Sequence, residues 1–242
     1  MTTSVESASH SVRSPTWHRP LRLTPLHHEH LAKGAHMVER DSWSIPWTYG
    51  DPQRERKALR EGVGLLDISE QGKIDVKGEG VEAILQAALP DVDGLEVGAA
   101  AEGDGLTVYR LTNEQALVLT PPTSWQPSFE TLQRIAGQHQ CAHVTDMTSA
   151  LCGLRLLGPR APDVMQRISA LDLARDRFAD GFSTQGAVAK TRALVARRDG
   201  PEATGYDLYV DRDLGGYLWD AVLEAGGPLG LRSVGRQAEE PD

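Results

Sequence analysis

Two stretches bounded by glycines, Gly72-Lys73-Ile74-Asp75-Val76-Lys77-Gly78 and Gly153-Leu154-Arg155-Leu156-Leu157-Gly158, indicate how this chain folds. The first alternates apolar and polar residues, which is typical of a β-strand with one buried face. The second is also expected to be a strand. Each is followed within a few residues by apolar side chains at helical spacing, so each predicts a strand that leads into a helix.

Downstream of the first strand, the apolar pattern predicts a helix over residues 81–88, and Pro90 ends it. Residues 106–111 and 115–120 flank a short Thr-Asn-Glu turn and predict a β-hairpin. A further helix is expected over residues 125–137. The first half of the chain therefore has the order strand, helix, two strands, helix.

The same order follows the second strand. A helix is expected over residues 161–168, strands near 187–197 and 205–211, and a final helix over 214–225. Two such units sharing a sheet, with helices on one face, predict an α+β fold built from duplicated split-βαβ (ferredoxin-like) units.

The two ends of the chain differ from its middle in composition. Residues 1–20 are rich in Ser and Thr and poor in aliphatic residues, which predicts a disordered tail. Residues 236–242 are expected to form a loose C-terminal tail. A single folded domain is therefore predicted over residues 21–235.

Composition limits the classes of function and location. The 242 residues are 40% hydrophobic, which is enough for a real core. The net charge of −9 and the lack of a Lys/Arg run argue against a nucleic-acid partner. The sequence shows no run of 18 apolar residues and no signal-peptide pattern, so we expect no membrane partner. Cys141 and Cys152 form no CxxC pair, and a reducing, cytoplasmic location is expected.

The segment His27-His28-Glu29-His30 resembles a metal-binding cluster in composition but not in spacing. Zinc-binding helices place two ligands four residues apart, as in HExxH, whereas His27 and His30 are three apart. We therefore expect a surface helix with one packed histidine and no metal site.

Two carboxylates stand beside glycines. Asp104 lies between Gly103 and Gly105, and Asp207 follows Gly205-Tyr206 on a predicted strand. Glycines next to a carboxylate allow a ligand to approach closely. Asp-Gly is also a common turn dipeptide, and the pattern alone leaves both interpretations open.

Several motifs in order carry a resemblance to a known family. They are Thr24-Pro25-Leu26, His30, Gly34-Ala35, Gly64-Leu65-Leu66-Asp67-Ile68-Ser69, Gly72-Lys73-Ile74, Gly158-Pro159, Gly205-Tyr206-Asp207 and Leu218-Trp219. Together they resemble the aminomethyltransferase (glycine cleavage T-protein) family over roughly residues 21–235. The folate-binding domains of sarcosine oxidase and dimethylglycine dehydrogenase are similar as well.

The resemblance implies a tetrahydrofolate-binding domain that transfers a one-carbon unit from a small amine or methylated substrate. By the same resemblance, Asp104 is the expected catalytic residue. The residues expected to bind the cofactor are Tyr109, Glu202, Tyr206 and Asp207. A carboxylate at Asp207 suits the paired N–H donors of a pterin.

The sequence also departs from the family pattern. Gly105 replaces a second aspartate, and Glu70-Gln71 replaces a His-Met pair. The family's Ala-Arg-Asp falls near residues 237–239, so its arginine is expected to be lost. The family's C-terminal barrel is expected to be absent.

Three hypotheses follow from these departures. The first is a tetrahydrofolate-dependent enzyme completed by a separately encoded barrel half or a flavoprotein subunit. The second is a non-catalytic small subunit of a heteromeric, sarcosine-oxidase-type complex. The third is the same scaffold used for folate-independent small-molecule chemistry. Under the first two, or in a homo-oligomer, an apolar edge is expected to be an interface. Its residues are Leu223, Pro228, Leu229 and Leu231.

Overall fold

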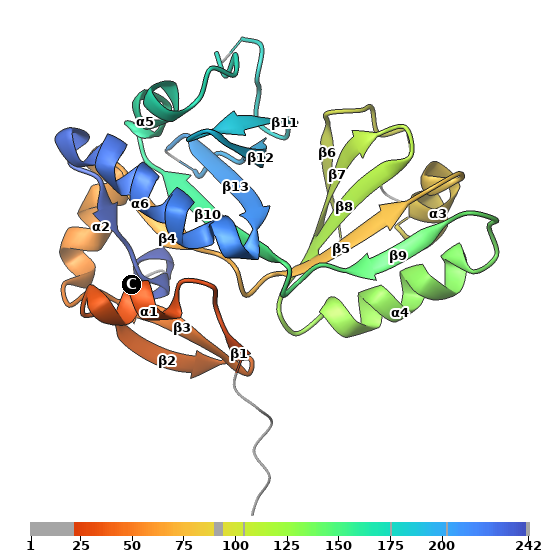
Figure 1. Ribbon diagram of the computed structural model, residues 1–242, viewed down its shortest axis with the longest axis horizontal. Helices are drawn as coiled ribbons and strands as arrows, with labels where there is room; N and C mark the ends of the chain where they lie inside the picture. The colour runs from red at the N-terminus through yellow and green to blue at the C-terminus, as the bar shows by residue number, and fades with distance from the viewer. Residues whose placement is uncertain (1–21, 90–93, 104, 175, 202, 241–242) are drawn as a thin grey trace, which may run out of the picture.

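The chain forms a mixed fold of helices and strands with three sheets (Figure 1). The mixture of helices and strands agrees with the sequence-based prediction. None of the helices in the described part of the chain is long and apolar enough to cross a membrane. The computed structural model describes residues 22–89, 94–103, 105–174, 176–201 and 203–240. The expected N-terminal tail, residues 1–20, lies outside the described residues.

The described strands are β1 (Arg22–Leu23), β2 (His36–Arg40), β3 (Trp43–Thr48), β4 (Gly64–Asp67), β5 (Gly72–Lys77), β6 (Ala100–Gly103), β7 (Leu106–Thr112), β8 (Gln115–Thr120), β9 (His143–Asp146), β10 (Leu151–Leu157), β11 (Ser183–Val188), β12 (Thr191–Arg197), β13 (Gly205–Asp211) and β14 (Arg232–Ser233). The α-helices are α1 (His27–Ala32), α2 (Pro52–Glu61), α3 (Val81–Ala88), α4 (Trp125–Ala136), α5 (Ala161–Ile168) and α6 (Gly215–Gly226). The 3-10 helices are η2 (Arg212–Leu214), η3 (Gly227–Leu229) and η4 (Arg236–Glu239).

Each of the two larger sheets is named after one of its strands, β5 or β10. The β5 sheet has the order β6-β7-β8-β5-β9, and the β10 sheet has the order β11-β12-β13-β10-β4-β14. In the β5 sheet, β8 lies antiparallel to both β5 and β7. In the β10 sheet, β13 lies antiparallel to both β10 and β12. The small sheet β1-β3-β2 packs beside α1.

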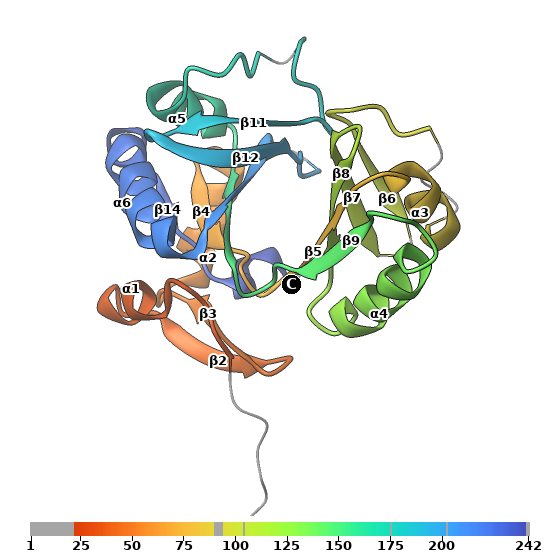
Figure 2. The same cartoon turned by 45° about the vertical axis from the view of Figure 1, so that its right-hand side comes forward.

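The two larger sheets face one another, and each carries helices on its outer face (Figure 2). The sequence-based expectation of one shared sheet was therefore wrong. The physical reason is that both facing surfaces are apolar enough to bury each other. The buried residues between them are Ile68, Tyr109, Leu117, Leu119, Leu194, Ala196 and Tyr209.

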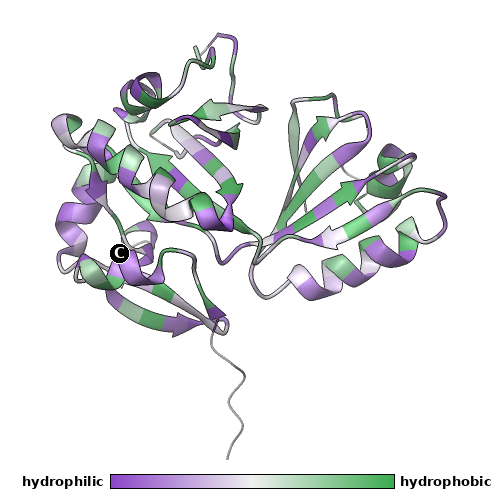
Figure 3. Ribbon diagram, in the orientation of Figure 1, coloured by the Kyte–Doolittle hydropathy of each residue, from purple (hydrophilic) through white to green (hydrophobic). Residues whose placement is uncertain are grey.

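This packing also changes the environment of β5. The alternating sequence predicted one solvent-facing side, but both faces of the strand are buried. Ile74 and Val76 pack under α3 and α4, while Lys73 and Asp75 are on the opposite side of the strand, also buried. Figure 3 shows apolar segments, in green, on both larger sheets.

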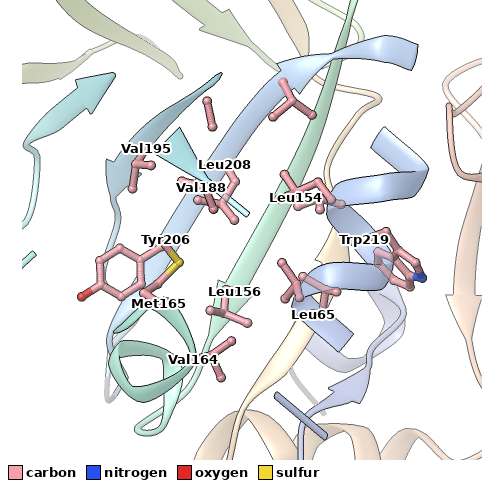
Figure 4. Close-up of a cluster of buried hydrophobic side chains, with 14 of the residues drawn as sticks. Leu65, Leu154, Leu156, Val164, Met165, Val188, Val195, Tyr206, Leu208 and Trp219 are labelled. Atoms are coloured by element: carbon pink, nitrogen blue, oxygen red, sulfur yellow. The ribbon is translucent and has the colours of Figure 1, made fainter. Parts of the chain in front are cut away.

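The main core lies between the β10 sheet and helices α5 and α6 (Figure 4). Leu154 and Leu156 from β10 pack there with Val164 of α5 and the fully buried Trp219 of α6. The alternation of β10 places these leucines on the helix side and leaves Arg155 for the opposite face.

Residues 236–240 are folded, with η4 over Arg236–Glu239, contrary to the expected loose tail. Val234 and Ala238 are buried against Leu66. Glu55 of α2 accepts hydrogen bonds from the amide of Gly235 at 2.8 Å and of Tyr49 at 2.7 Å. One buried carboxylate thus joins the end of β3 to the C-terminal segment.

Lys73 fixes the place where the chain crosses between the two larger sheets. Its fully buried ammonium donates to the carbonyl oxygens of Ser69 and Gln71, each at 2.8 Å, and of Thr148 at 3.2 Å. Ser69 and Gln71 lie on the crossing from β4 to β5, and Thr148 lies on the return from β9 to β10. Burial lowers the pKa of Lys73 to about 8.

Replacing Lys73 should loosen both crossings. We expect Lys73→Met to lower the free energy of unfolding by roughly 2–4 kcal/mol, because three charge-assisted hydrogen bonds are lost. The relieved cost of burying an ammonium offsets only part of that loss. Urea unfolding measures the change. Lys57→Met on α2, an exposed lysine, is the control and should change the value by less than about 0.5 kcal/mol.

The same lysine predicts a pH dependence. From pH 8 to 10.5 the unfolded chain holds the Lys73 proton and the folded chain has released it. Stability from this group therefore rises with pH in that range, by up to about 1.4 kcal/mol per pH unit. The wild-type protein should gain stability relative to Lys73→Met across this range. A constant difference between the two would contradict the assigned environment.

Candidate functional site

The structure brings together some, but not all, of the residues singled out from the sequence. Asp104 and Glu202 lie outside the described residues. Tyr109 on β7 and Asp207 on β13 lie in the buried space between the two larger sheets. Tyr206 lies on the other face of β13, in the main core beside Met165 and Val195 (Figure 4). Adjacent strand residues point to opposite faces, so Tyr206 and Asp207 cannot serve one pocket.

Asp207 is held by an arginine that the sequence analysis did not assign a role. Arg155 on β10 donates from Nε to Oδ1 and from Nη2 to Oδ2 of Asp207, both at 2.7 Å. The two residues are directly opposite in the antiparallel ladder, and Asp207 is fully buried. This bidentate geometry is the strongest form of an Arg–carboxylate pair. The signal for it was present in Gly153–Gly158, where Arg155 interrupts an apolar strand.

Two tyrosines adjoin this pair. Burial and the charge of Asp207 raise the pKa of both Tyr109 and Tyr209, so both phenols are neutral donors. Tyr209 donates to Gln71 Oε1 at 3.1 Å. Tyr209 follows Asp207 by two residues and therefore shares its face, a relation that the period of a strand could have revealed.

A cavity of about 450 Å³ opens between the two sheets next to Tyr209. Asp75 and Gln115 line it from the β5 sheet, with Gln115 Nε2 donating to Asp75 Oδ1 at 2.7 Å. Gln185 and Arg192 line it from the β10 sheet. The lining of the cavity is thus about half polar and half apolar, and its charged residues are of both signs. Neither Tyr109 nor Asp207 is among its lining residues.

A chain of charges connects Asp207 to the C-terminal segment. Arg155 Nη1 lies 3.6 Å from Glu239 Oε1. Arg236 contacts both Glu239 and the buried Glu70. Arg236 precedes the segment 237–239, where the family resemblance implies that an arginine is lost, and that loss stays a prediction. Residues 166 positions apart meet here, and no local pattern could indicate that.

The histidine segment contains one packed member, as expected. His30 is fully buried and accepts from Tyr49 Oη at Nδ1, at 2.8 Å. Its Nε2 donates to Asp67 Oδ2 at 2.9 Å. Burial opposes ionisation of Asp67, but hydrogen bonds from His30 and Ser69 outweigh it and hold the pKa of Asp67 below its ordinary value. Both ring nitrogens are satisfied, which makes this a structural link between α1, β4 and the end of β3.

The expected apolar C-terminal edge is largely covered. Leu223, Leu229 and Leu231 are half-buried against the main core, and Pro228 is exposed. The large apolar side chains that are exposed in the described residues lie elsewhere, at Leu23, Leu31, Val97, Phe182 and Tyr217. The edge is therefore partly covered within the chain, and its role as an interface stays a prediction.

Comparison with known sequences gives a consistent result. The family described as "GCVT N-terminal domain" matches residues 26–240. An aminomethyltransferase of Streptomyces avermitilis is 33% identical over 225 residues, which cover 88% of this chain and 60% of that protein. One of Desulforamulus reducens is 29% identical and covers 91% and 62%. The chain spans about three fifths of the length of these relatives.

Comparison with solved structures supports the same fold. The glycine cleavage system aminomethyltransferase T of Bartonella henselae superimposes with a TM-score of 0.77 at 22% identity, over 90% of this chain and 60% of that one. A chain of the heterotetrameric sarcosine oxidase of Corynebacterium sp. U-96 gives a TM-score of 0.64 at 20% identity. That match covers 88% of this chain and 99% of the other. The extent of the family match, its agreement with the observed fold and the identity to curated aminomethyltransferases lead to one conclusion: this chain belongs to the GCVT N-terminal domain family.

Proposed function

We propose that this chain is an assisting subunit of a heteromeric assembly for amine or one-carbon chemistry, and that Asp207 supports its fold rather than a pterin. The observation that carries the proposal is the bidentate Arg155–Asp207 pair. The carboxylate expected to receive a pterin already receives two donors from the protein itself.

The residues present do not fit tetrahydrofolate as the family resemblance implies. A pterin would present its two N–H donors to the same carboxylate oxygens that Arg155 occupies. The Asp207 side chain is fully buried and does not line the cavity between the sheets. Tyr206, also expected at the cofactor, is turned into the main core. We therefore derive no chemical step through a bound folate.

One structural match supports a subunit role. A chain of a heterotetrameric sarcosine oxidase has the same fold, with a TM-score of 0.64. By this proposal a partner, such as a flavoprotein subunit or a separately encoded barrel half, supplies the remaining machinery. A homo-oligomer, in which a second copy of this chain is the partner, is the alternative assembly.

A second function, tetrahydrofolate-dependent one-carbon transfer with a partner subunit, is favoured by a different observation. The cavity of about 450 Å³ between the sheets has room for part of a small molecule. In this function Asp104 remains the proposed catalytic residue, and Tyr109, Glu202 and Asp207 remain the proposed cofactor residues. Tyr206, which the sequence analysis also expected at the cofactor, faces the main core and is not one of them. Arg155 would have to leave Asp207 when the ligand binds.

Two further sequence-based hypotheses remain proposals. The corresponding strand orders β7-β8-β5-β9 and β12-β13-β10-β4 support a duplicated split-βαβ unit, with β4 and β9 taking equivalent places. The second is a single folded domain over residues 21–235, to which η4 is now added.

A calorimetric titration with tetrahydrofolate separates the two functions. We expect the wild-type chain not to bind measurably, with a Kd above about 1 mM. A full-length aminomethyltransferase of the family serves as the positive control. Saturable binding to the wild-type chain, lost in Asp207→Asn, would instead support the tetrahydrofolate-dependent function.

Removing Arg155 should expose the cost of the buried carboxylate. We expect Arg155→Met to destabilise the fold by about 3–5 kcal/mol, because Asp207 is left buried without its partner. The double variant Arg155→Met/Asp207→Leu should recover much of that loss, since both charges are gone. Urea unfolding of the single and double variants gives the coupling energy. Arg160→Met, which removes an exposed ion pair with Asp163, is the control and should cost less than about 1 kcal/mol.

The subunit role predicts assembly in solution. Co-expressed with the products of neighbouring genes, the chain should elute with a flavoprotein or a barrel-type protein, and light scattering should give the mass of the complex. A stable interface of this kind should bury more than about 1,000 Å². A monomer that ignores these proteins and turns over a one-carbon donor alone would refute the proposal.

A further inference from the structure

A second cavity lies on the side of the molecule away from the β5 sheet, beside α1, α2, α6 and β14 (Figure 2). Its volume is about 370 Å³. Three cations from separate elements line it: Lys33 at the end of α1, Arg54 on α2 and Arg232 on β14. The tertiary fold thus brings together positive charges that are far apart in the sequence.

Two carboxylates also line the cavity, but the fold already uses both of them. Glu55 is buried, and its Oε1 accepts from the amide of Tyr49 at 2.7 Å while its Oε2 accepts from the amide of Gly235 at 2.8 Å. Asp51 accepts from the amide of Arg54 at 3.0 Å, at the start of α2. Neither carboxylate is therefore free to neutralise the cations fully.

The cations lack comparable partners. In the described ranges, the side chains of Lys33 and Arg232 make no ion pair and no hydrogen bond. Arg54 comes only within 3.9 Å of Asp51. All three cations are exposed, so a ligand in the cavity can reach them. Three cations and two carboxylates give the lining a net charge of +1, in a chain whose net charge is −9.

Part of the lining is apolar. Leu223 of α6 and Leu231 beside β14 are half-buried against the main core and line the cavity. The hydroxyl of Ser233, also in the lining, has no hydrogen-bond partner among the described residues. Sites for small molecules typically combine apolar surface with a few polar groups in this way.

We propose that this cavity binds a small organic monocarboxylate. The side chains of Lys33 and Arg232 contact its carboxylate, and the two leucines contact its apolar body. A monoanion offsets the net charge of +1, whereas a phosphate dianion would leave an excess of negative charge beside the two carboxylates. The inference does not depend on the subunit role or on folate, because none of these residues lines the cavity between the sheets.

Sodium benzoate is the probe, titrated into the full chain and followed by NMR. The methyl groups of Leu223 and Leu231 are the reporters. We expect both to shift saturably, with a Kd of about 5 mM or tighter, and not to shift with sodium chloride at the same concentration. Acetate and phosphate have the charge without the apolar body, and benzamide has the body without the charge. Each should bind at least about fivefold more weakly than benzoate.

Three variants locate the interaction. Arg232→Gln removes one of the two contacting charges and should weaken benzoate binding at least about fivefold. Lys33→Gln removes the other, should have a similar effect, and decides the question if Arg232→Gln does not fold. Arg60→Gln is the matched control, because Arg60 is an exposed arginine of α2 that does not line the cavity. It should change benzoate binding by less than about twofold.

Other results would overturn the inference. Equal responses to benzoate and sodium chloride would mean that salt screening alone moves the signals. Equal binding of benzamide would mean an apolar surface without an anion site, and equal binding of acetate or phosphate would mean a site for simple anions. An equal effect of Arg232→Gln and Arg60→Gln would place the anion elsewhere. None of these results bears on the tetrahydrofolate titration, so this inference and the proposed function can fail separately.

Discussion

The buried ammonium of Lys73 is the interaction on which the rest of the arrangement depends. The chain leaves the β10 sheet after β4, builds the β5 sheet, and returns to form β10. Lys73 ties the outgoing and the returning segment to one point through three carbonyl oxygens. Because both crossings are fixed there, the two sheets face each other in one relative orientation. That orientation sets which side chains share the space between them.

The space between the sheets is unusual because it buries ionised groups as well as apolar ones. Arg155 and Asp207 neutralise each other across adjacent strands, and Glu239 continues the network to the C-terminal segment. A buried ion pair is weak evidence for stability, since desolvation offsets much of its attraction. Its clearer consequence here is specificity: β10, β13 and η4 must all be in place before every charge has a partner.

The same network includes Asp207, the carboxylate to which the family resemblance assigns a pterin. The aminomethyltransferase relatives match in sequence and fold, yet a protein side chain occupies the carboxylate expected to receive the pterin. The ionic chain also passes from Asp207 through Arg155, Glu239 and Arg236 to Glu70. The network thus joins the space between the sheets to the C-terminal segment.

The sequence by itself determined the local elements and the family. Helix α5 and the hairpin of β7 and β8 follow from periodicity and turn residues, because these depend on neighbours a few positions apart. Alternation along β13 could also have shown that Tyr206 and Asp207 face opposite ways. The tertiary structure alone decided that the two sheets pack face to face. It also decided that Arg155 pairs with Asp207 across 52 residues and that Arg236 meets Glu70 across 166. Such pairs depend on how sheets and crossings are placed in space, and a linear pattern of residues does not contain that information.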